Sequence, residues 1–130
     1  MDHPSTASLA RRRILIAEDE YFIMQDLRSG LENLGAIVLG PVPSVADALA
    51  LIAAEGGIDA AVLDLNLRGE RAYAVADALS DRGIPFVFST GYSDEMIDPR
   101  YRRAPVCEKP VNMRRLERAL SEVIAEVAAP

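Results

Sequence analysis

Five polar residues of the kinds that handle metal ions and phosphate groups follow short apolar runs of the sequence. They are Glu18, Asp19, Asp64, Thr90 and Lys109. A carboxylate can bind a hard cation or act as a phosphoryl acceptor, whereas an ammonium and a hydroxyl can contact phosphoryl oxygens. Three crowded carboxylates repel one another and raise each other's pKa. The set therefore favours a divalent cation, Mg²⁺ by preference, with Mn²⁺ as an alternative.

Each of these residues also has a plain structural interpretation when it is taken alone. The Glu-Asp-Glu of residues 18–20 fits a solvated turn with favourable charge at a helix N-terminus. Asp64 could cap a loop, and Thr90 could lie in an ordinary turn. Lys109 is the only lysine in the chain, and a single lysine is usually a surface residue. The elements that carry these residues decide between the interpretations.

Short apolar runs alternate with helical spacing along the chain. Continuous apolar runs predict buried strands at residues 14–17, 37–39, 60–63, 86–88 and 106–108. Apolar residues three or four positions apart predict helices over residues 20–34, 44–56, 72–82 and 112–127, with at most a short helix at 93–97. Strands that alternate with helices predict a parallel sheet covered on both faces. The carboxyl ends of such strands meet at one edge, so the five polar residues should meet there.

Length and composition limit the other function classes. The 130 residues suit one domain, and we expect a flexible tail over residues 1–12 before a domain at 13–128. A net charge of −6 argues against nucleic-acid binding, because proteins that bind nucleic acids usually have a basic face. No apolar run reaches the roughly 20 residues that span a bilayer, and the start lacks a signal segment. One cysteine, Cys107, excludes an internal disulfide. A cytoplasmic protein without nucleic-acid or membrane partners is expected.

Four motifs together resemble the response regulator receiver family of bacterial two-component signalling. They are ILIAEDE at 14–20, AVLDLNL at 61–67, FSTGY at 88–92 and CEKP at 107–110. The resemblance covers about residues 13–128. It implies the flavodoxin-like receiver fold, an α/β doubly wound parallel sheet of five strands in the order 2-1-3-4-5, with helices on both faces.

The resemblance also implies a role for each polar residue. Asp64 would be the phosphoacceptor, and Thr90 and Lys109 would contact the phosphoryl group. The implied metal ligands are Glu18, Asp19, Asp64 and the backbone carbonyl of Asn66. The peptide bond between Lys109 and Pro110 would be cis, a form that costs only about 0.5–1 kcal/mol before proline.

The sequence departs from the usual receiver pattern at several positions. The acidic pair is Glu-Asp rather than Asp-Asp, and Leu67-Arg68 replaces a usual Met-Pro. Val106 stands where most receivers have an aromatic switch residue. FSTGY is similar to the FATGY motif of a subgroup that is often single-domain and often partnered with HWE or HisKA2 kinases. We hypothesise that Gly91 provides flexibility and that Tyr92 partly replaces the missing aromatic.

These observations predict a single-domain response regulator rather than an enzyme. A sensor histidine kinase, or a small phosphodonor, would phosphorylate Asp64. The protein would then act on an unknown partner, dimerise or serve as a phosphate sink. One alternative is an aspartate-nucleophile phosphatase, but the chain has no spare length for a substrate cap, and nucleotide-binding glycine motifs are absent. The other is a degenerate receiver that binds partners independently of phosphorylation, which Val106 favours weakly.

Overall fold

A five-stranded parallel sheet forms the centre of the molecule. The structure is a computed structural model that describes residues 9–91 and 97–128. The sheet strands are β1 (Arg13–Ala17), β2 (Ile37–Val42), β3 (Ala60–Asp64), β6 (Phe86–Thr90) and β7 (Val106–Glu108). They lie in the order β2-β1-β3-β6-β7, and all neighbouring pairs are parallel. Numbered along the chain, this order is 2-1-3-4-5, so the predicted fold is confirmed.

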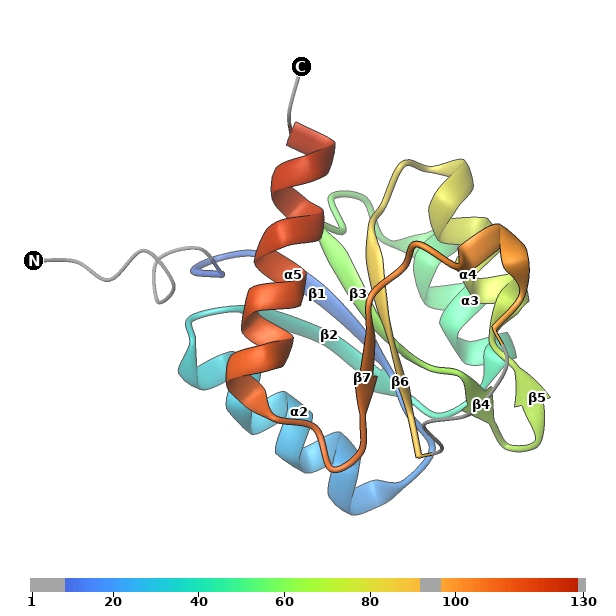
Figure 1. Cartoon of the computed structure of the whole chain (residues 1–130), viewed down its shortest axis with the longest axis horizontal. Helices are drawn as coiled ribbons and strands as arrows, with labels where there is room; N and C mark the ends of the chain where they lie inside the picture. The colour runs from blue at the N-terminus through green and yellow to red at the C-terminus, as the bar shows by residue number, and fades with distance from the viewer. Residues whose placement is uncertain (1–8, 92–96, 129–130) are drawn as a thin grey trace, which may run out of the picture.

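Helices cover both faces of this sheet (Figure 1). On one face lie α2 (Tyr21–Asn33) and α5 (Met113–Ala128). On the other lie α3 (Val45–Ala54), α4 (Tyr73–Asp81) and the short 3-10 helix η1 (Pro99–Tyr101). Two separate hydrophobic clusters fill the spaces between the sheet and these two layers.

The apolar runs become strands because both of their faces are covered. All five residues of β3 are buried, and successive side chains point to opposite clusters. Val62 packs in the cluster under α2 and α5, whereas Leu63 packs in the cluster under α3 and α4. Ser44 begins α3 as predicted, since its hydroxyl accepts a hydrogen bond of 3.1 Å from the Asp47 N–H.

The segment after Asp64 is more ordered than the predicted loop. Two short antiparallel strands, β4 (Asn66–Leu67) and β5 (Glu70–Arg71), form a hairpin there. Its turn residues Arg68 and Gly69 have φ values of 49° and 84°. This left-handed geometry is the one that tight hairpins require. Two-residue strands are too short to show alternation in the sequence, so only the Arg-Gly turn could have indicated the hairpin.

Strand β2 extends past the predicted end at residue 39. It continues through a cis Gly40–Pro41 bond to Val42, and the register with β1 shifts between Leu15 and Ala17. Gly40 has a φ of 92°, and a Cβ there would lie 2.8 Å from the Val42 nitrogen. Only glycine fits this position.

The packed region begins before residue 13, earlier than the predicted boundary. Leu9 is fully buried in the cluster under α2 and α5. The Arg11 N–H donates a hydrogen bond of 2.8 Å to the Gly35 carbonyl. A single leucine among polar residues shows no periodicity, so the sequence pattern could not reveal this contact.

Two further expectations concern the helices. The short helix expected at 93–97 falls mostly on residues 92–96, which lie outside the described residues, and Ile97 is not helical. The described helical turn in this region is η1. None of the described helices is long and apolar enough to cross a membrane.

Candidate functional site

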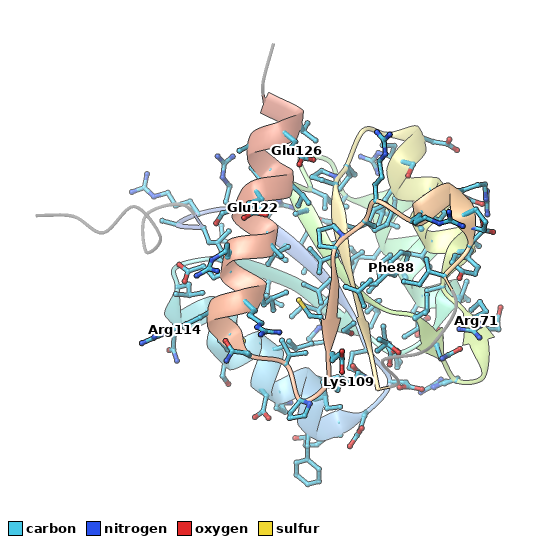
Figure 2. The ribbon with its side chains drawn as sticks, in the orientation of Figure 1. Arg71, Phe88, Lys109, Arg114, Glu122 and Glu126 are labelled. Atoms are coloured by element: carbon cyan, nitrogen blue, oxygen red, sulfur yellow. The ribbon has the colours of Figure 1, made fainter. Side chains whose placement is uncertain are left out.

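The sheet brings the chemically active side chains to its carboxyl edge. Asp64 is the last residue of β3, and Glu18 and Asp19 directly follow β1. Strand register places Ala17 beside Leu63, and Asp64 beside Ser89. Figure 2 shows Lys109 at the same edge, where the chain leaves β7 and turns toward α5. Residues up to 91 positions apart in the sequence are therefore neighbours in space.

Three carboxylates form a tight cluster at this edge. One oxygen of each of Glu18, Asp19 and Asp64 lies within 4.8 Å of the other two. Glu18 is completely buried and Asp64 is 5% exposed, whereas Asp19 is exposed to solvent. Burial of carboxylates is costly unless they are paired or bind a cation.

The ammonium of Lys109 pairs with both buried carboxylates. Its Nζ atom lies 2.8 Å from Asp64 Oδ2 and 2.9 Å from Glu18 Oε1. Burial alone would lower the pKa of Lys109, but the hydrogen bonds to Asp64 and Glu18 outweigh burial and raise it. Lys109 therefore remains charged and holds Asp64 in place.

Burial has the opposite consequence for Glu18. It raises the pKa of Glu18 to about 7, although hydrogen bonds from Lys109 and from the Glu20 N–H oppose the increase. The neighbouring Asp64 charge also contributes to the increase. One lysine therefore compensates only part of the cost of two buried carboxylates.

Backbone N–H groups hold the three carboxylates, and the sequence did not predict these contacts. The Glu20 N–H donates to Glu18 Oε2 at 3.0 Å, and the Asn66 N–H donates to Asp64 Oδ1 at 3.1 Å. The Arg68 N–H donates to Asp19 Oδ2 at 2.8 Å. Proline, usual at the position of Arg68, has no N–H to donate. The departure of Leu67-Arg68 from the usual Met-Pro was the sequence feature that could have indicated the contact between Arg68 and Asp19.

The donor set fits a divalent cation of the magnesium type. Three carboxylates and one ammonium leave two negative charges, which equal the charge of Mg²⁺ in magnitude. All available donors are oxygen atoms, the ligands that Mg²⁺ prefers. Glu18 Oε1 is buried 2.9 Å from the Lys109 ammonium, and as a carboxylate oxygen it can also serve as a metal ligand. No other group of three metal-ligating side chains occurs within residues 9–91 and 97–128.

The remaining predicted residues flank this cluster. Thr90 is buried at the end of β6, and its carbonyl accepts a 2.8 Å hydrogen bond from the Lys109 N–H. The Lys109–Pro110 peptide bond is cis. Gly91 is exposed, and its Cβ position is open, so no steric contact among the described residues requires glycine there.

The switch candidate Val106 stands apart from the cluster. Val106 begins β7 beside Phe88 and is 41% exposed. An aliphatic side chain on this surface cannot perform the inward rotation of an aromatic ring. Tyr92 lies outside the described residues.

Known structures decide the family, although no protein-family model and no curated protein sequence matches the chain. The solution structure of SdrG from Sphingomonas melonis Fr1 is 47% identical in sequence, with a TM-score of 0.78. The match covers 90% of this chain and 98% of SdrG, a single-domain response regulator receiver. This chain belongs to the response regulator receiver family. The receiver therefore takes part in two-component signalling.

Other structures agree with this assignment. SdrG from Pseudomonas melonis Fr1, in a BeF3-activated conformation, is also 47% identical to the receiver, with a TM-score of 0.74 and coverage of 88% of this chain and 98% of that one. A CheY-like receiver domain from Methylobacillus flagellatus is 26% identical, with a TM-score of 0.75 over 88% of this chain and 99% of its own. Receiver domains are generally signalling modules, and they typically bind Mg²⁺.

Proposed function

We propose that this receiver accepts a phosphoryl group on Asp64 from the phosphohistidine of a sensor kinase. The observation that carries the proposal is the Asp64 carboxylate itself, which is held by Lys109 and the Asn66 N–H next to two further carboxylates. A carboxylate so fixed is a preorganised nucleophile.

The transfer exchanges one bond for another. An Asp64 carboxylate oxygen forms a bond to phosphorus while the bond from the histidine nitrogen to phosphorus breaks, and the nitrogen keeps the electron pair. Lys109 and the Thr90 hydroxyl would contact the phosphoryl oxygens, where negative charge must be stabilised. Later attack by water would break the acyl phosphate bond, release inorganic phosphate and restore the Asp64 carboxylate.

The metal ion would be held by side chains already at this edge. Glu18, Asp19 and Asp64 would be its carboxylate ligands, and the carbonyl of Asn66 would complete the protein part of the shell. Bound Mg²⁺ neutralises charge on the carboxylates and on the incoming phosphoryl group. Asp19 is the exposed member of the cluster, so an ion has direct access to it from solvent.

The state of SdrG in its activated structure supports this proposal. That structure is of a BeF3-activated conformation. Beryllofluoride has the tetrahedral shape of a phosphoryl group. At 47% identity over nearly all of SdrG, we infer that this receiver responds to the same kind of modification.

We place the receiver in the FATGY subgroup and in the cytoplasm, and we expect an HWE or HisKA2 kinase as phosphodonor. The phosphorylated receiver would then bind a downstream protein, or it would act as a sink that removes phosphoryl groups from the kinase. Tyr92, with Gly91 before it, would report the modification in place of the aromatic that Val106 replaces.

The switch hypothesis can be tested by NMR spectroscopy. In wild type, phosphorylation should shift amide resonances well beyond the site, and Tyr92→Ala should lose the distant shifts but keep those near Asp64. Identical distant shifts in the variant would contradict the role of Tyr92.

Phosphoryl acceptance can be tested by intact-mass measurement. Wild type incubated with Mg²⁺ and acetyl phosphate, or with a cognate kinase, should gain the mass of one phosphoryl group. Asp64→Asn should gain none, and chelation of Mg²⁺ should abolish the gain in wild type. A wild-type mass that never changes with either donor would instead favour a phosphorylation-independent interaction module, the function that Val106 suggests.

A further inference from the structure

A buried hydroxyl lies beside the phosphoacceptor, and the function proposed above does not use it. Ser89 on β6 is in register with Asp64 on β3 and with Cys107 on β7. Val62 and Val87, two residues before Asp64 and Ser89, both pack in the cluster under α2 and α5. Because side chains alternate along a strand, Asp64 and Ser89 both face that side of the sheet.

The Ser89 side chain is buried without a hydrogen bond. Ser89 is 1% exposed, and among the described residues its Oγ atom has no partner. A buried hydroxyl that lacks a partner destabilises the folded state, because it has lost its hydrogen bonds to water. Such groups are rare in native proteins and call for an explanation.

The residue in register with Ser89 is Asp64, whose carboxyl group is a hydrogen-bond acceptor. Adjacent strands lie about 4.8 Å apart, so the hydroxyl is within reach of this group by a change of rotamer. In this state each Asp64 oxygen already accepts a hydrogen bond from another donor. Oδ1 accepts from the Asn66 N–H at 3.1 Å, and Oδ2 accepts from Lys109 Nζ at 2.8 Å.

Phosphorylation would change this balance of donors and acceptors. A phosphoryl group adds three oxygen acceptors with about two negative charges. The Lys109 ammonium should move toward them, because the phosphoryl charge exceeds that of the carboxyl group it leaves. The Asp64 carboxyl group then loses the donor that Lys109 provides in the resting state.

We propose that Ser89 donates a hydrogen bond to the Asp64 carboxyl group only when Asp64 carries the phosphoryl group. The inference rests on the proposed function of Asp64. Ser89 is unsatisfied in the resting receiver and satisfied in the phosphorylated one, so it favours the phosphorylated state. The FATGY motif has alanine at the position that Ser89 occupies in the FSTGY sequence of this chain.

The test compares Ser89→Ala with wild type in the full chain, with beryllofluoride and Mg²⁺ as the probe. Without the probe, Ser89→Ala should raise the melting temperature by about 3 °C, since it removes an unsatisfied hydroxyl. With the probe, calorimetric titration should show about tenfold weaker beryllofluoride binding, because the new hydrogen bond cannot form. A residue with only a structural role would not produce these opposite effects.

Cys107→Ala is the matched control. Cys107 is buried in the same row but one strand further from Asp64, so its truncation should lower the melting temperature and leave beryllofluoride affinity unchanged. Equal affinities for wild type and Ser89→Ala would overturn the role of Ser89. Wild type that binds no beryllofluoride would instead overturn the proposed function of Asp64, and the inference with it.

Discussion

At the scale of single residues, the site contains buried carboxylates that lower the stability of the fold and also serve its chemistry. Glu18 is completely buried beside Asp64, and the two share one ammonium, that of Lys109. Such an arrangement is costly in a protein without metal, because each buried charge has lost its water. The same crowding would favour the binding of a divalent cation, because the cation would offset the repulsion between the carboxylates.

The free-energy cost of burying the Glu18 carboxylate gives a prediction for the stability of the metal-free protein. Its pKa is about 7 in the folded chain but near 4.5 when unfolded. Between these values the unfolded chain releases the proton first, so stability should fall as the pH rises from about 4.5 through 7. Glu18→Gln should flatten this fall and raise the free energy of unfolding at pH 8 by about 2 kcal/mol.

Urea unfolding in the presence of a chelator measures both effects. Glu20→Gln removes a charge from an exposed neighbour and should leave the pH dependence as in wild type. Addition of Mg²⁺ should stabilise wild type and Glu20→Gln, and should stabilise Glu18→Gln much less. If Glu18→Gln retains the wild-type pH dependence, burial of Glu18 does not have the assigned cost.

At the scale of elements, the β4–β5 hairpin connects the two sides of the site. It begins two residues after Asp64, and its turn residue Arg68 donates to Asp19. The positive φ at Arg68 directs this N–H toward the acidic pair. The hairpin therefore positions Asp19. The usual Met-Pro in place of Leu67-Arg68 would require a different turn, because proline has no N–H to donate.

This role of the hairpin predicts different effects for two substitutions of Arg68. Arg68→Pro removes the N–H and demands a φ near −65°, so it should destabilise the receiver by about 2 kcal/mol and weaken Mg²⁺ binding. Arg68→Gly accepts the positive φ and keeps the N–H, so its Mg²⁺ affinity should match wild type. Calorimetric Mg²⁺ titration of both variants decides the question. Equal affinities for the two variants would show that the hairpin does not position Asp19.

At the scale of the whole molecule, the doubly wound topology creates the site. Each strand delivers its polar residue at the same edge, so side chains from β1, β3 and β7 meet around Asp64. The alternation of apolar runs and helices was sufficient to predict this arrangement, because strands buried on both faces leave a strong signal. The cluster of Glu18, Asp64 and Lys109 was therefore predictable from the alternation, whereas the strand order was predicted from the resemblance to the receiver family.

Other features depend on contacts that sequence patterns do not record. The buried Leu9, the β4–β5 hairpin and the donors from the Glu20 and Arg68 backbone each involve one or two residues. Periodicity needs several turns or repeats to be visible, so such local contacts leave no periodic signal. The unsatisfied hydroxyl of Ser89 also became visible only when register placed it beside Asp64.

Whether Asp64 itself carries the phosphoryl group is tested by locating the modified residue. An acyl phosphate is reduced by borohydride, which converts the phosphorylated aspartate into homoserine. After incubation with Mg²⁺ and phosphodonor, reduction and peptide mass mapping should find homoserine at position 64 and at no other aspartate. Homoserine at Asp19, or phosphate retained on a hydroxyl such as Ser89 or Thr90, would contradict the account.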